Sequence, residues 1–279
     1  MKVFGLIRQN VLFIILICFV IFCGCSKSIQ LPERGVCAHR GASETHPENT
    51  LPAFQEAIRL GAHMIELDVR MTKDGELILL HDDTLDRTTN GKGNVSDFNL
   101  AEVKRLDAGA WKDSKFTGTR IPTLSEAIDV MPKNIWLNVH IKEDTAVSRM
   151  TAELLLAKKR QHQAFIACQT HAADAVRQVS QNLMICNMER LENSEAYVDS
   201  TISMDTKFIQ LKIRSDAKLP DLVEKLKKKQ IKINYYFADT EEKLKKLFKV
   251  GVDFPLVDNL EVMINAAKEI GIKPLKPEF

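Results

Sequence analysis

Histidines, carboxylates and two basic residues recur in four short motifs between residues 39 and 142. The motifs are His39-Arg40-Gly41, Glu66-Leu67-Asp68, His81-Asp82 and His140-Ile141-Lys142. Carboxylates at positions i and i+2 suit a hard cation such as Ca²⁺ or Mg²⁺, for which a phosphodiester offers further oxygen ligands. Histidines that titrate near neutrality can act as base and acid at phosphorus, and basic side chains can neutralise nonbridging oxygens. Each motif alone is common in structural positions, but together they contain the parts that phosphodiester hydrolysis needs.

The motifs must be positioned by secondary-structure elements, and from residue 36 onward predicted strands alternate with predicted helices. Short apolar, β-rich runs alternate with amphipathic helical patterns, which is typical of a parallel sheet with crossover helices. Strands are predicted at residues 36–39, 64–70, 77–81, 136–142, 164–170, 184–188, 208–213, 231–236 and 254–257. In a barrel of such units, polar residues at the carboxyl ends of strands form the active site.

A hairpin is predicted between the second and third of these strands. They are joined only by Thr72-Lys73-Asp74-Gly75, which is too short for a helical crossover. Direct pairing across this turn predicts that Asp68 faces Leu79 and that Glu66 faces His81. Since alternate residues of a strand share a face, the two carboxylates then point the same way with the imidazole beside them.

The hairpin accounts for one of the nine predicted strands and leaves eight for a TIM-like (β/α)8 barrel. We therefore predict this fold with the hairpin and a long loop inserted after the second strand. The loop is the polar stretch 82–120, expected above the barrel mouth. Cys37, Cys168 and Cys186 lie in apolar runs, and we expect them to be buried and unpaired.

Charge indicates no macromolecular partner. The formal net charge of +2 is too small to imply nucleic acid, and the lysine-rich stretch 225–229 is typical of the exposed face of an amphipathic helix. No protein partner is inferable. The expected ligand is therefore a small-molecule phosphodiester.

The N-terminus has the features of a bacterial export signal. Basic residues precede an apolar run over residues 11–23 that is shorter than the roughly 20 residues of a membrane-spanning helix. Gly24-Cys25 follows this run and resembles a lipobox, in which the cysteine is diacylated. A plain signal peptide and an uncleaved anchor are the alternatives.

These features divide the chain into three parts. We expect a lipoprotein-type signal peptide over residues 1–24, a short tether over 25–34 and a single barrel domain over 35–279. Lipidation at Cys25 would attach the protein to the membrane, on the periplasmic or extracellular side, within the cell envelope.

A longer series of motifs points to one family. In chain order they are His39-Arg40-Gly41, Pro47-Glu48-Asn49-Thr50, Glu66-Leu67-Asp68-Val69, Thr72-Lys73-Asp74-Gly75, His81-Asp82, Arg87-Thr88-Thr89-Asn90-Gly91-Lys92-Gly93 and Ile121-Pro122-Thr123-Leu124-Ser125-Glu126. In order and spacing, residues 36 to 142 resemble the glycerophosphodiester phosphodiesterase family. Further on, the likeness is reduced to the strand pattern and to the closing run Gly251-Val252-Asp253-Phe254-Pro255-Leu256-Val257-Asp258.

The resemblance implies roles for six residues. These are an acid–base pair (His39 and His81), metal ligands (Glu66 and Asp68) and contacts to the substrate phosphate (Arg40 and Lys142). The implied reaction is metal-dependent hydrolysis of a glycerophosphodiester to glycerol phosphate and an alcohol. Which histidine is the acid is not readable from the sequence.

His140 departs from the family pattern, which has a third metal-binding Glu on this strand. As a third ligand, the imidazole would remove one negative charge and offer a softer donor. We therefore expect one divalent ion, Ca²⁺ or Mg²⁺ by family, with Mn²⁺ or Zn²⁺ favoured by His140. Alternatively, His140 binds no metal and water completes the site.

Two further functions stay open from the sequence. The same barrel could hydrolyse an intact phospholipid or a glycan- or teichoic-type phosphodiester. It could also bind a phosphodiester without turnover, because the third carboxylate is missing. The presence of both histidines and both remaining carboxylates favours an enzyme.

Overall fold

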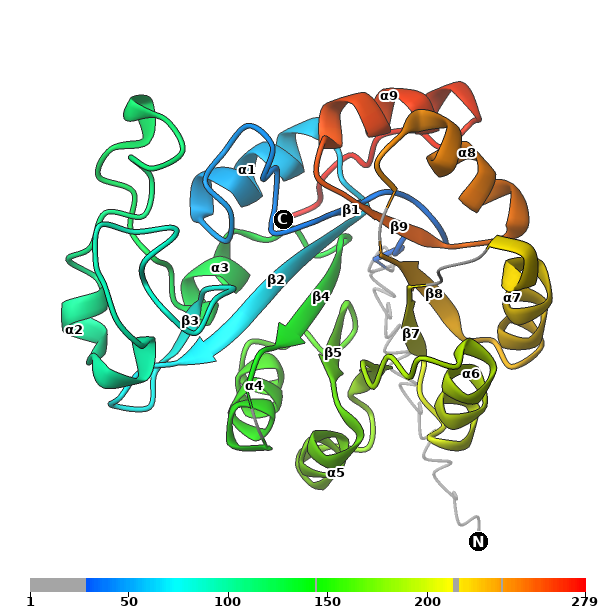
Figure 1. Ribbon diagram of the computed structural model, residues 1–279, viewed down its shortest axis with the longest axis horizontal. Helices are drawn as coiled ribbons and strands as arrows, with labels where there is room; N and C mark the ends of the chain where they lie inside the picture. The colour runs from blue at the N-terminus through cyan, green and yellow to red at the C-terminus, as the bar shows by residue number, and fades with distance from the viewer. Residues whose placement is uncertain (1–28, 144, 213–215, 237) are drawn as a thin grey trace, which may run out of the picture.

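Eight parallel strands close into a barrel in the computed structural model, which describes residues 29–143, 145–212, 216–236 and 238–279 (Figure 1). The sheet order is β1-β9-β8-β7-β6-β5-β4-β2, and β1 also pairs with β2 to close it. A ninth strand, β3, lies outside the barrel on β2. The strands are β1 (Cys37–Ala38), β2 (Met64–Met71), β3 (Leu77–Leu79), β4 (Trp136–Ile141), β5 (Ala164–Cys168), β6 (Met184–Asn187), β7 (Phe208–Leu211), β8 (Lys232–Tyr235) and β9 (Phe254–Val257). The predicted TIM-like barrel is confirmed.

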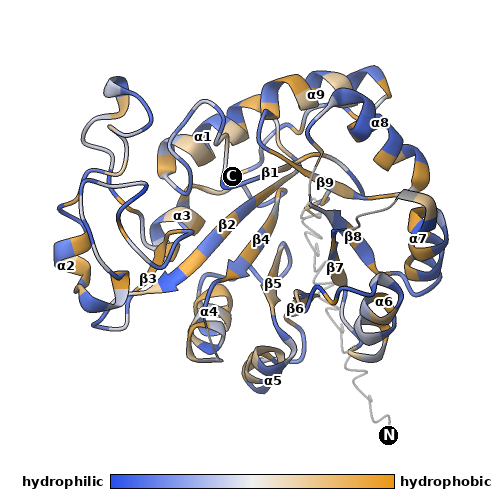
Figure 2. Ribbon diagram, viewed as in Figure 1, coloured by the Kyte–Doolittle hydropathy of each residue, from blue (hydrophilic) through white to orange (hydrophobic). Residues whose placement is uncertain are grey.

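Helices surround the barrel and cover its outer face (Figure 1). They are α1 (Leu51–Leu60), α3 (Leu124–Val130), α4 (Thr145–Ala157), α5 (Thr170–Val179), α6 (Ser194–Ser203), α7 (Leu219–Lys228), α8 (Glu241–Val250) and α9 (Leu260–Glu269). In α7 the buried residues Leu222, Val223 and Leu226 recur at helical spacing, while Lys225 and Lys228 are exposed. The lysine-rich stretch is therefore the polar side of a barrel helix, and Figure 2 shows the same division in α8.

The amino-terminal half of the barrel interior is filled by large side chains. Phe165 stacks on Phe208 with ring centroids 4.0 Å apart, and Trp136 meets Phe208 edge-on at 5.2 Å. These residues, with Met64 and Phe254, come from the first or second positions of their strands and form a separate hydrophobic cluster. Because this layer closes the lower end of the barrel, only the carboxyl-terminal end is left to hold polar groups.

The hairpin is confirmed, but its predicted register is wrong by one residue. Val69 pairs with Leu79, whereas the prediction paired Asp68 with Leu79. The cause lies in the turn, because Thr72 still belongs to the ladder: its N–H donates to Glu76 O at 3.0 Å. Three residues, not four, therefore form the turn, a common hairpin length with a left-handed glycine.

His81 therefore does not face Glu66 across a ladder. It lies two residues beyond the end of β3, where the chain turns toward the mouth. Arg70 on β2 holds this position, since its Nε and Nη2 donate to the His81 carbonyl at 3.1 and 2.9 Å. The imidazole reaches the mouth because the strand ends early.

The long insertion 82–120 forms a small lobe beside the mouth. It contains η1 (Val95–Asp97), α2 (Leu100–Val103) and η2 (Ser114–Phe116). Its hydrophobic cluster includes Leu85, Val95 and Val103. Lys112 donates to the carbonyl of Ser43 at 2.8 Å and so ties the lobe to the segment that follows β1.

Both ends of the described chain lie at the amino-terminal end of the barrel. Trp136 Nε1 donates to Pro32 O at 2.8 Å, and Lys232 pairs with Glu33 at 2.7 Å. The C-terminal segment returns to the same end, where Leu275 N donates to Gly61 O at 2.9 Å. The predicted signal peptide 1–24 and Cys25 lie outside the described residues. No described helix combines the length and apolar character needed to cross a bilayer.

The three cysteines expected to be buried and unpaired are so. Cys37, Cys168 and Cys186 are free and buried. Burial raises the pKa of Cys168 to about 12, so its thiol stays protonated and unreactive at neutral pH.

We predict that His63 makes the fold sensitive to acid. Its Nδ1 accepts from Val36 N at 3.2 Å and its Nε2 lies 2.9 Å from Lys273 O, so the folded chain holds a neutral ring. Burial lowers the pKa of His63 in the folded state, whereas the unfolded chain takes up a proton near the ordinary value of ~6.5. The free energy of unfolding should therefore fall below that pH, by at most about 1.4 kcal/mol per unit for one proton.

Denaturant unfolding at pH 7.5 and 5.5 would measure this dependence. In His63→Gln the amide keeps one acceptor and one donor without titrating. The difference in the free energy of unfolding between pH 7.5 and pH 5.5 should therefore be smaller than in the wild type. The exposed His171→Gln serves as control and should keep the wild-type difference. Equal pH dependence in both variants would contradict the assignment.

Candidate functional site

One polar cavity of about 110 Å³ opens at the carboxyl ends of the barrel strands. Its lining residues are His39, Arg40, Glu66, Asp68, His81, His140, Lys142, Arg190, Gln210, Lys212, Tyr236 and Leu256. All seven residues to which the sequence assigned catalytic, phosphate-binding or metal-binding roles are among them. The barrel thus brings together groups separated by about 100 positions in the chain.

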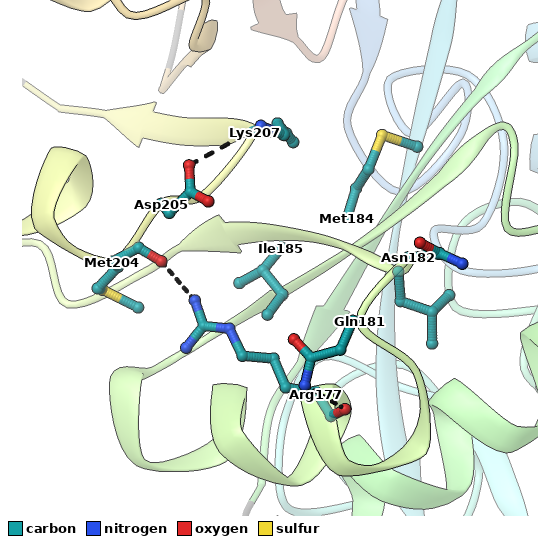
Figure 3. Close-up of a pocket in the computed structure, with 9 residues that line it drawn as sticks. Arg177, Gln181, Asn182, Met184, Ile185, Met204, Asp205 and Lys207 are labelled. Carbon is teal, nitrogen blue, oxygen red and sulfur yellow. Dashed lines mark hydrogen bonds and ion pairs between the residues drawn. The ribbon is translucent and has the colours of Figure 1, made fainter.

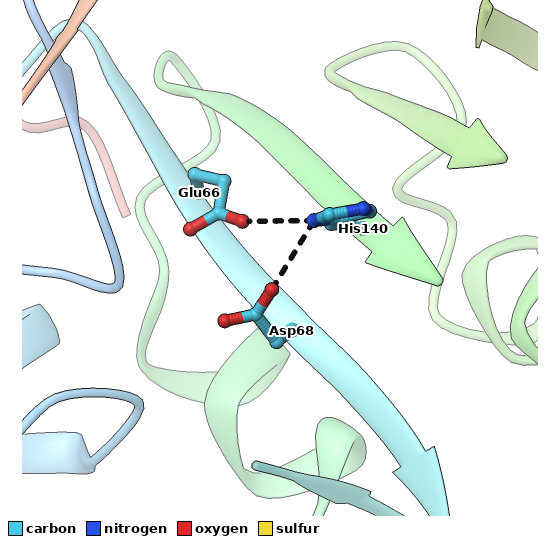
Figure 4. A group of neighbouring side chains, drawn as sticks. All are labelled: Glu66, Asp68 and His140. Atoms are coloured by element: carbon cyan, nitrogen blue, oxygen red, sulfur yellow. Dashed lines mark ion pairs between the residues drawn. The ribbon is translucent and has the colours of Figure 1, made fainter. Parts of the chain in front are cut away.

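The carboxylates and His140 form one compact cluster (Figure 4). Parallel pairing of β2 with β4 sets Asp68 beside His140 in register. His140 Nδ1 lies 3.2 Å from Asp68 Oδ1 and 3.4 Å from Glu66 Oε1. The potential ligand atoms of the three residues lie within 4.8 Å of one another, which suits coordination of a single ion.

The chemistry of this cluster fits a divalent cation. Asp68 is 1% exposed, and its Oδ1 accepts no hydrogen bond from the described residues. Burial favours the neutral acid, but His140, Lys142 and Arg40 outweigh it and hold the pKa of Asp68 well below its usual range. A buried, ionised oxygen that lacks a donor and points toward two further ligand atoms is what a metal site offers.

His39 is fixed by a carboxylate behind it. Its Nδ1 lies 2.7 Å from Asp258 Oδ1, which leaves Nε2 for the cavity, and its ring meets Tyr236 edge-on at 5.8 Å. Burial would lower the pKa of His39, but the hydrogen bond to Asp258 and the charge of Glu66 outweigh it and raise the pKa above its ordinary value. The protonated form is therefore favoured.

His81 is also held by a carboxylate, but its pKa is shifted in the opposite direction. Its Nδ1 lies 2.7 Å from Asp82 Oδ1, and Asp82 is held in turn by Arg87 at 2.7 Å. Burial dominates here and lowers the pKa of His81, although the charge of Asp68 and the bond to Asp82 oppose it. The neutral form of His81 is favoured, so the surroundings of the two imidazoles shift their pKa values in opposite directions.

The two predicted phosphate contacts lie on either side of the cluster. Arg40 Nε is 3.3 Å from Asp68 Oδ2 and its Nη1 donates to Glu48 at 2.8 Å. Lys142 Nζ is 3.6 Å from Asp68 Oδ1. The backbone of Arg40 is left-handed, at φ 56°, which lets its N–H donate to Glu66 Oε2 at 3.0 Å while its side chain enters the mouth.

Several residues near the mouth had no predicted role. Glu48 bridges Arg40 and Arg87, and Asn49 holds Asp68 through two hydrogen bonds. Both belong to a motif that the sequence showed but that carried no assignment. Asp258 ends the closing run of the chain, where an aspartate after an apolar strand was the available signal. Arg190 and Lys212 had no signal, because their segments match no motif.

A larger cavity of about 470 Å³ lies at the opposite end of the barrel, between α5 and β7 (Figure 3). Its charged groups already have partners, since Arg177 donates to Met204 O and Lys207 lies 3.9 Å from Asp205. No histidine or glutamate lines it among the described residues. Size alone therefore does not identify the reactive site.

Solved structures share this barrel. A glycerophosphodiester phosphodiesterase from Agrobacterium tumefaciens is 26% identical with a TM-score of 0.73, covering 84% of this chain and 99% of that chain. A phosphodiesterase from Oleispira antarctica, solved in complex with the product sn-glycerol-3-phosphate, is 27% identical with a TM-score of 0.74, covering 85% and 97%. Fold and site together define the class: a TIM-barrel phosphoric diester hydrolase.

Sequence comparison narrows the class. The model of the glycerophosphoryl diester phosphodiesterase family matches residues 39–210. A glycerophosphodiester phosphodiesterase from Caldanaerobacter subterraneus subsp. tengcongensis is 36% identical over 251 residues, covering 85% of this chain and 98% of the relative. The chain belongs to the glycerophosphoryl diester phosphodiesterase family, as the motif series predicted.

We predict that Asn49 is required to hold Asp68. Its Nδ2 donates to Asp68 Oδ2 at 2.8 Å and its Oδ1 accepts from Asp68 N at 3.0 Å, with the backbone at φ 56°. Asn49→Ala would leave a buried N–H unpaired and place alanine in a left-handed conformation. Each effect costs about 1–3 kcal/mol, so the free energy of unfolding should fall by at least about 2 kcal/mol. In Asn49→Asp the N–H keeps its acceptor but two carboxylates meet. The loss in free energy of unfolding relative to the wild type should therefore become smaller as pH falls. A loss that does not change with pH would contradict the pairing.

Proposed function

We propose that the protein hydrolyses glycerophosphodiesters to glycerol phosphate and an alcohol, with a divalent ion and a pair of histidines. The observation that carries this proposal is the arrangement of His39 and His81. Each imidazole is tied through Nδ1 to a carboxylate, which leaves Nε2 for a cavity that also holds the acidic cluster, Arg40 and Lys142. Such a pair can move protons to and from a phosphate bound between them.

The residues that would hold the ion are Glu66, Asp68 and His140. Bound there, a divalent ion would withdraw electron density from phosphorus and neutralise charge on a nonbridging oxygen. Ca²⁺ or Mg²⁺ is expected from the family. The nitrogen donor of His140 lowers the preference for these hard ions and raises it for Mn²⁺ or Zn²⁺.

The chain's own groups supply the rest of the reaction. Arg40 and Lys142 bind the nonbridging oxygens and fix the phosphate. His81, with its lowered pKa, accepts a proton from the attacking water. His39, with its raised pKa, gives a proton to the leaving oxygen as the P–O bond breaks. The water's oxygen stays on glycerol phosphate, and the alcohol leaves with the proton of His39.

Removal of the negative charge of Glu66 or Asp68 tests whether the reaction depends on a metal ion. Glu66→Gln or Asp68→Asn should lower kcat by on the order of 100-fold or more and abolish metal retention, because each removes a charged ligand. Activity would be followed as release of glycerol phosphate from glycerophosphodiesters, and bound metal by elemental analysis. Glu76→Gln, at an exposed position next to the hairpin turn, removes the same charge and should behave as wild type. Full activity of either cluster variant, or of the wild type in excess chelator, would exclude a metal mechanism.

Replacement of His140 tests whether it belongs to the ligand set. His140→Glu adds a hard anionic ligand at similar reach, so the ratio of activity with Ca²⁺ or Mg²⁺ to activity with Mn²⁺ or Zn²⁺ should rise. His140→Gln, which is neutral and a weak ligand, is the matched control and should lower affinity for all four ions. If wild type and His140→Glu have the same preference and affinity, water or another residue completes the site.

The pH profile at saturating metal tests the two histidine roles. Activity should fall at high pH when His39 loses its proton and at low pH when His81 gains one. Asp258→Asn removes the bond that raises the pKa of His39, so the alkaline limb should move to lower pH. Asp82→Asn removes a bond that raises the pKa of His81, so the acid limb should move to lower pH. Movement of the opposite limbs would reverse the assignment.

We also propose that diacylated Cys25 anchors the protein in the cell envelope. The short apolar run and Gly24-Cys25 support this, and two acyl chains at ~0.8 kcal/mol per buried CH₂ suffice for stable attachment. Wild type should fractionate with membranes, and a Cys25→Ser protein should be released once its signal is cleaved. An uncleaved Cys25→Ser protein found wholly in membranes would point to a signal anchor instead.

A further inference from the structure

We infer that the wall of the mouth at the ends of β6, β7 and β8 is a second anion site, which selects phosphodiesters carrying an additional negative charge on one of the two esterified groups. The inference rests on the proposed hydrolysis and concerns the class of diester that the site prefers. The residues are Arg190, Lys212 and Tyr236, which lie just beyond these three neighbouring strands.

These residues share the cavity with the acidic cluster and lie on the His39 side of it. Arg190 Cζ is 5.7 Å and Lys212 Nζ is 5.0 Å from the centroid of the Tyr236 ring. The same ring meets His39 edge-on at 5.8 Å. A group attached to the phosphate on the side of His39 therefore extends toward two cations.

Among the described residues, no carboxylate neutralises the charges of this wall. Arg40 and Lys142, the cations near the cluster, lie within 4.0 Å of the Asp68 carboxylate. Across the described ranges, neither Arg190 nor Lys212 forms an ion pair with a carboxylate, and both side chains are exposed. Two unneutralised cations at a cavity wall attract an anion and repel a cationic group.

The position of Arg190 is built by buried amides. Its Nη2 donates to Gln210 Oε1, Gln210 Nε2 donates to Asn234 Oδ1 at 2.9 Å, and Asn234 Nδ2 donates to Phe254 O at 2.6 Å. Gln210 and Asn234 are 2% and 0% exposed. Arg190 also has a left-handed backbone, at φ 46°, as Arg40 does. Backbone strain and a buried relay that fix a surface guanidinium are expected where it binds a ligand.

Tyr236 does not offer a site for a quaternary ammonium group. Such groups bind over the face of an aromatic ring, and this ring already has two protein cations within 6 Å of its centroid. The ammonium group of choline would be repelled by the positive charges of Arg190 and Lys212. A carboxylate or phosphate on the alcohol would instead accept hydrogen bonds from Arg190 and Lys212.

A series of three substrates with one common diester tests the inference. At neutral pH the alcohol group is cationic in glycerophosphoethanolamine, neutral in its N-acetyl derivative and anionic in its N-succinyl derivative, and the three substrates are named here by that charge. The wild type should show kcat/KM rising in that order, with about fivefold per cation between neutral and anionic substrates, and the ratio should fall with added salt. In Arg190→Gln and Lys212→Gln the anionic-to-neutral ratio should fall, and in the double variant it should approach one. Lys207→Gln, which changes the same charge at the other end of β7, should keep the wild-type ratio.

Three results would overturn the inference. The first is an anionic-to-neutral ratio near one in the wild type. The second is a ratio unchanged by both substitutions. The third is that the variants are inhibited more weakly than the wild type by added glycerol phosphate while their anionic-to-neutral ratio is unchanged. That result would mean that the wall binds the released product and not a substrate group. If the wild type hydrolyses none of the three substrates at saturating metal, the proposed function itself fails.

Discussion

The buried negative charge of Asp68 is the constraint on which the mouth of the barrel depends. An ionised carboxylate that is 1% exposed would cost several kcal/mol without compensation. Arg40, Asn49, His140 and Lys142 all lie against it, and they come from the turn after β1, the start of α1 and the end of β4. Because one charge draws these segments together, the site and the barrel closure are coupled.

The same charge accounts for unusual backbone geometry. Arg40 and Asn49 both have φ of 56°, a region that disfavours side chains, and both contact Asp68. Strain of this kind persists only where surrounding contacts outweigh it. A hydrogen bond to a buried charge is stronger than one between neutral groups and can offset such strain. The first two motifs of the chain are thus local conformations that the carboxylate stabilises.

Local patterns explain why the fold and part of the site were predictable. The alternation of strands and helices gave the barrel, and the two-residue period of a strand put Glu66 and Asp68 on one side of β2. The hairpin register was not predictable in the same way, because it depends on whether Thr72 belongs to the turn or to the ladder. A one-residue difference in strand pairing depends on the hydrogen bonds of the folded turn. The same residues are compatible with either pairing, so their types do not reveal it.

The partners of the site residues were harder to predict. Asp258 meets His39 across 219 positions, and Arg190 reaches the mouth through a relay of buried amides on β7 and β8. Such contacts depend on barrel closure and on side-chain reach, which periodicity does not encode. His140 shows the opposite case: its place beside Asp68 follows from strand order alone, while its effect on ion preference depends on donor chemistry.

The place where the chain enters the barrel has a consequence for how the mouth meets its surroundings. The segment around Pro32 and Glu33 is fixed to the first residues of β4 and β8, at the end opposite the cavity. Any surface that holds the protein through residues before this segment therefore faces the closed end of the barrel. With such an attachment the mouth would open to the aqueous phase, and diffusing, acyl-free diesters would enter it directly. If that surface were a bilayer, one of its lipids would have to leave its leaflet and pass around the whole barrel.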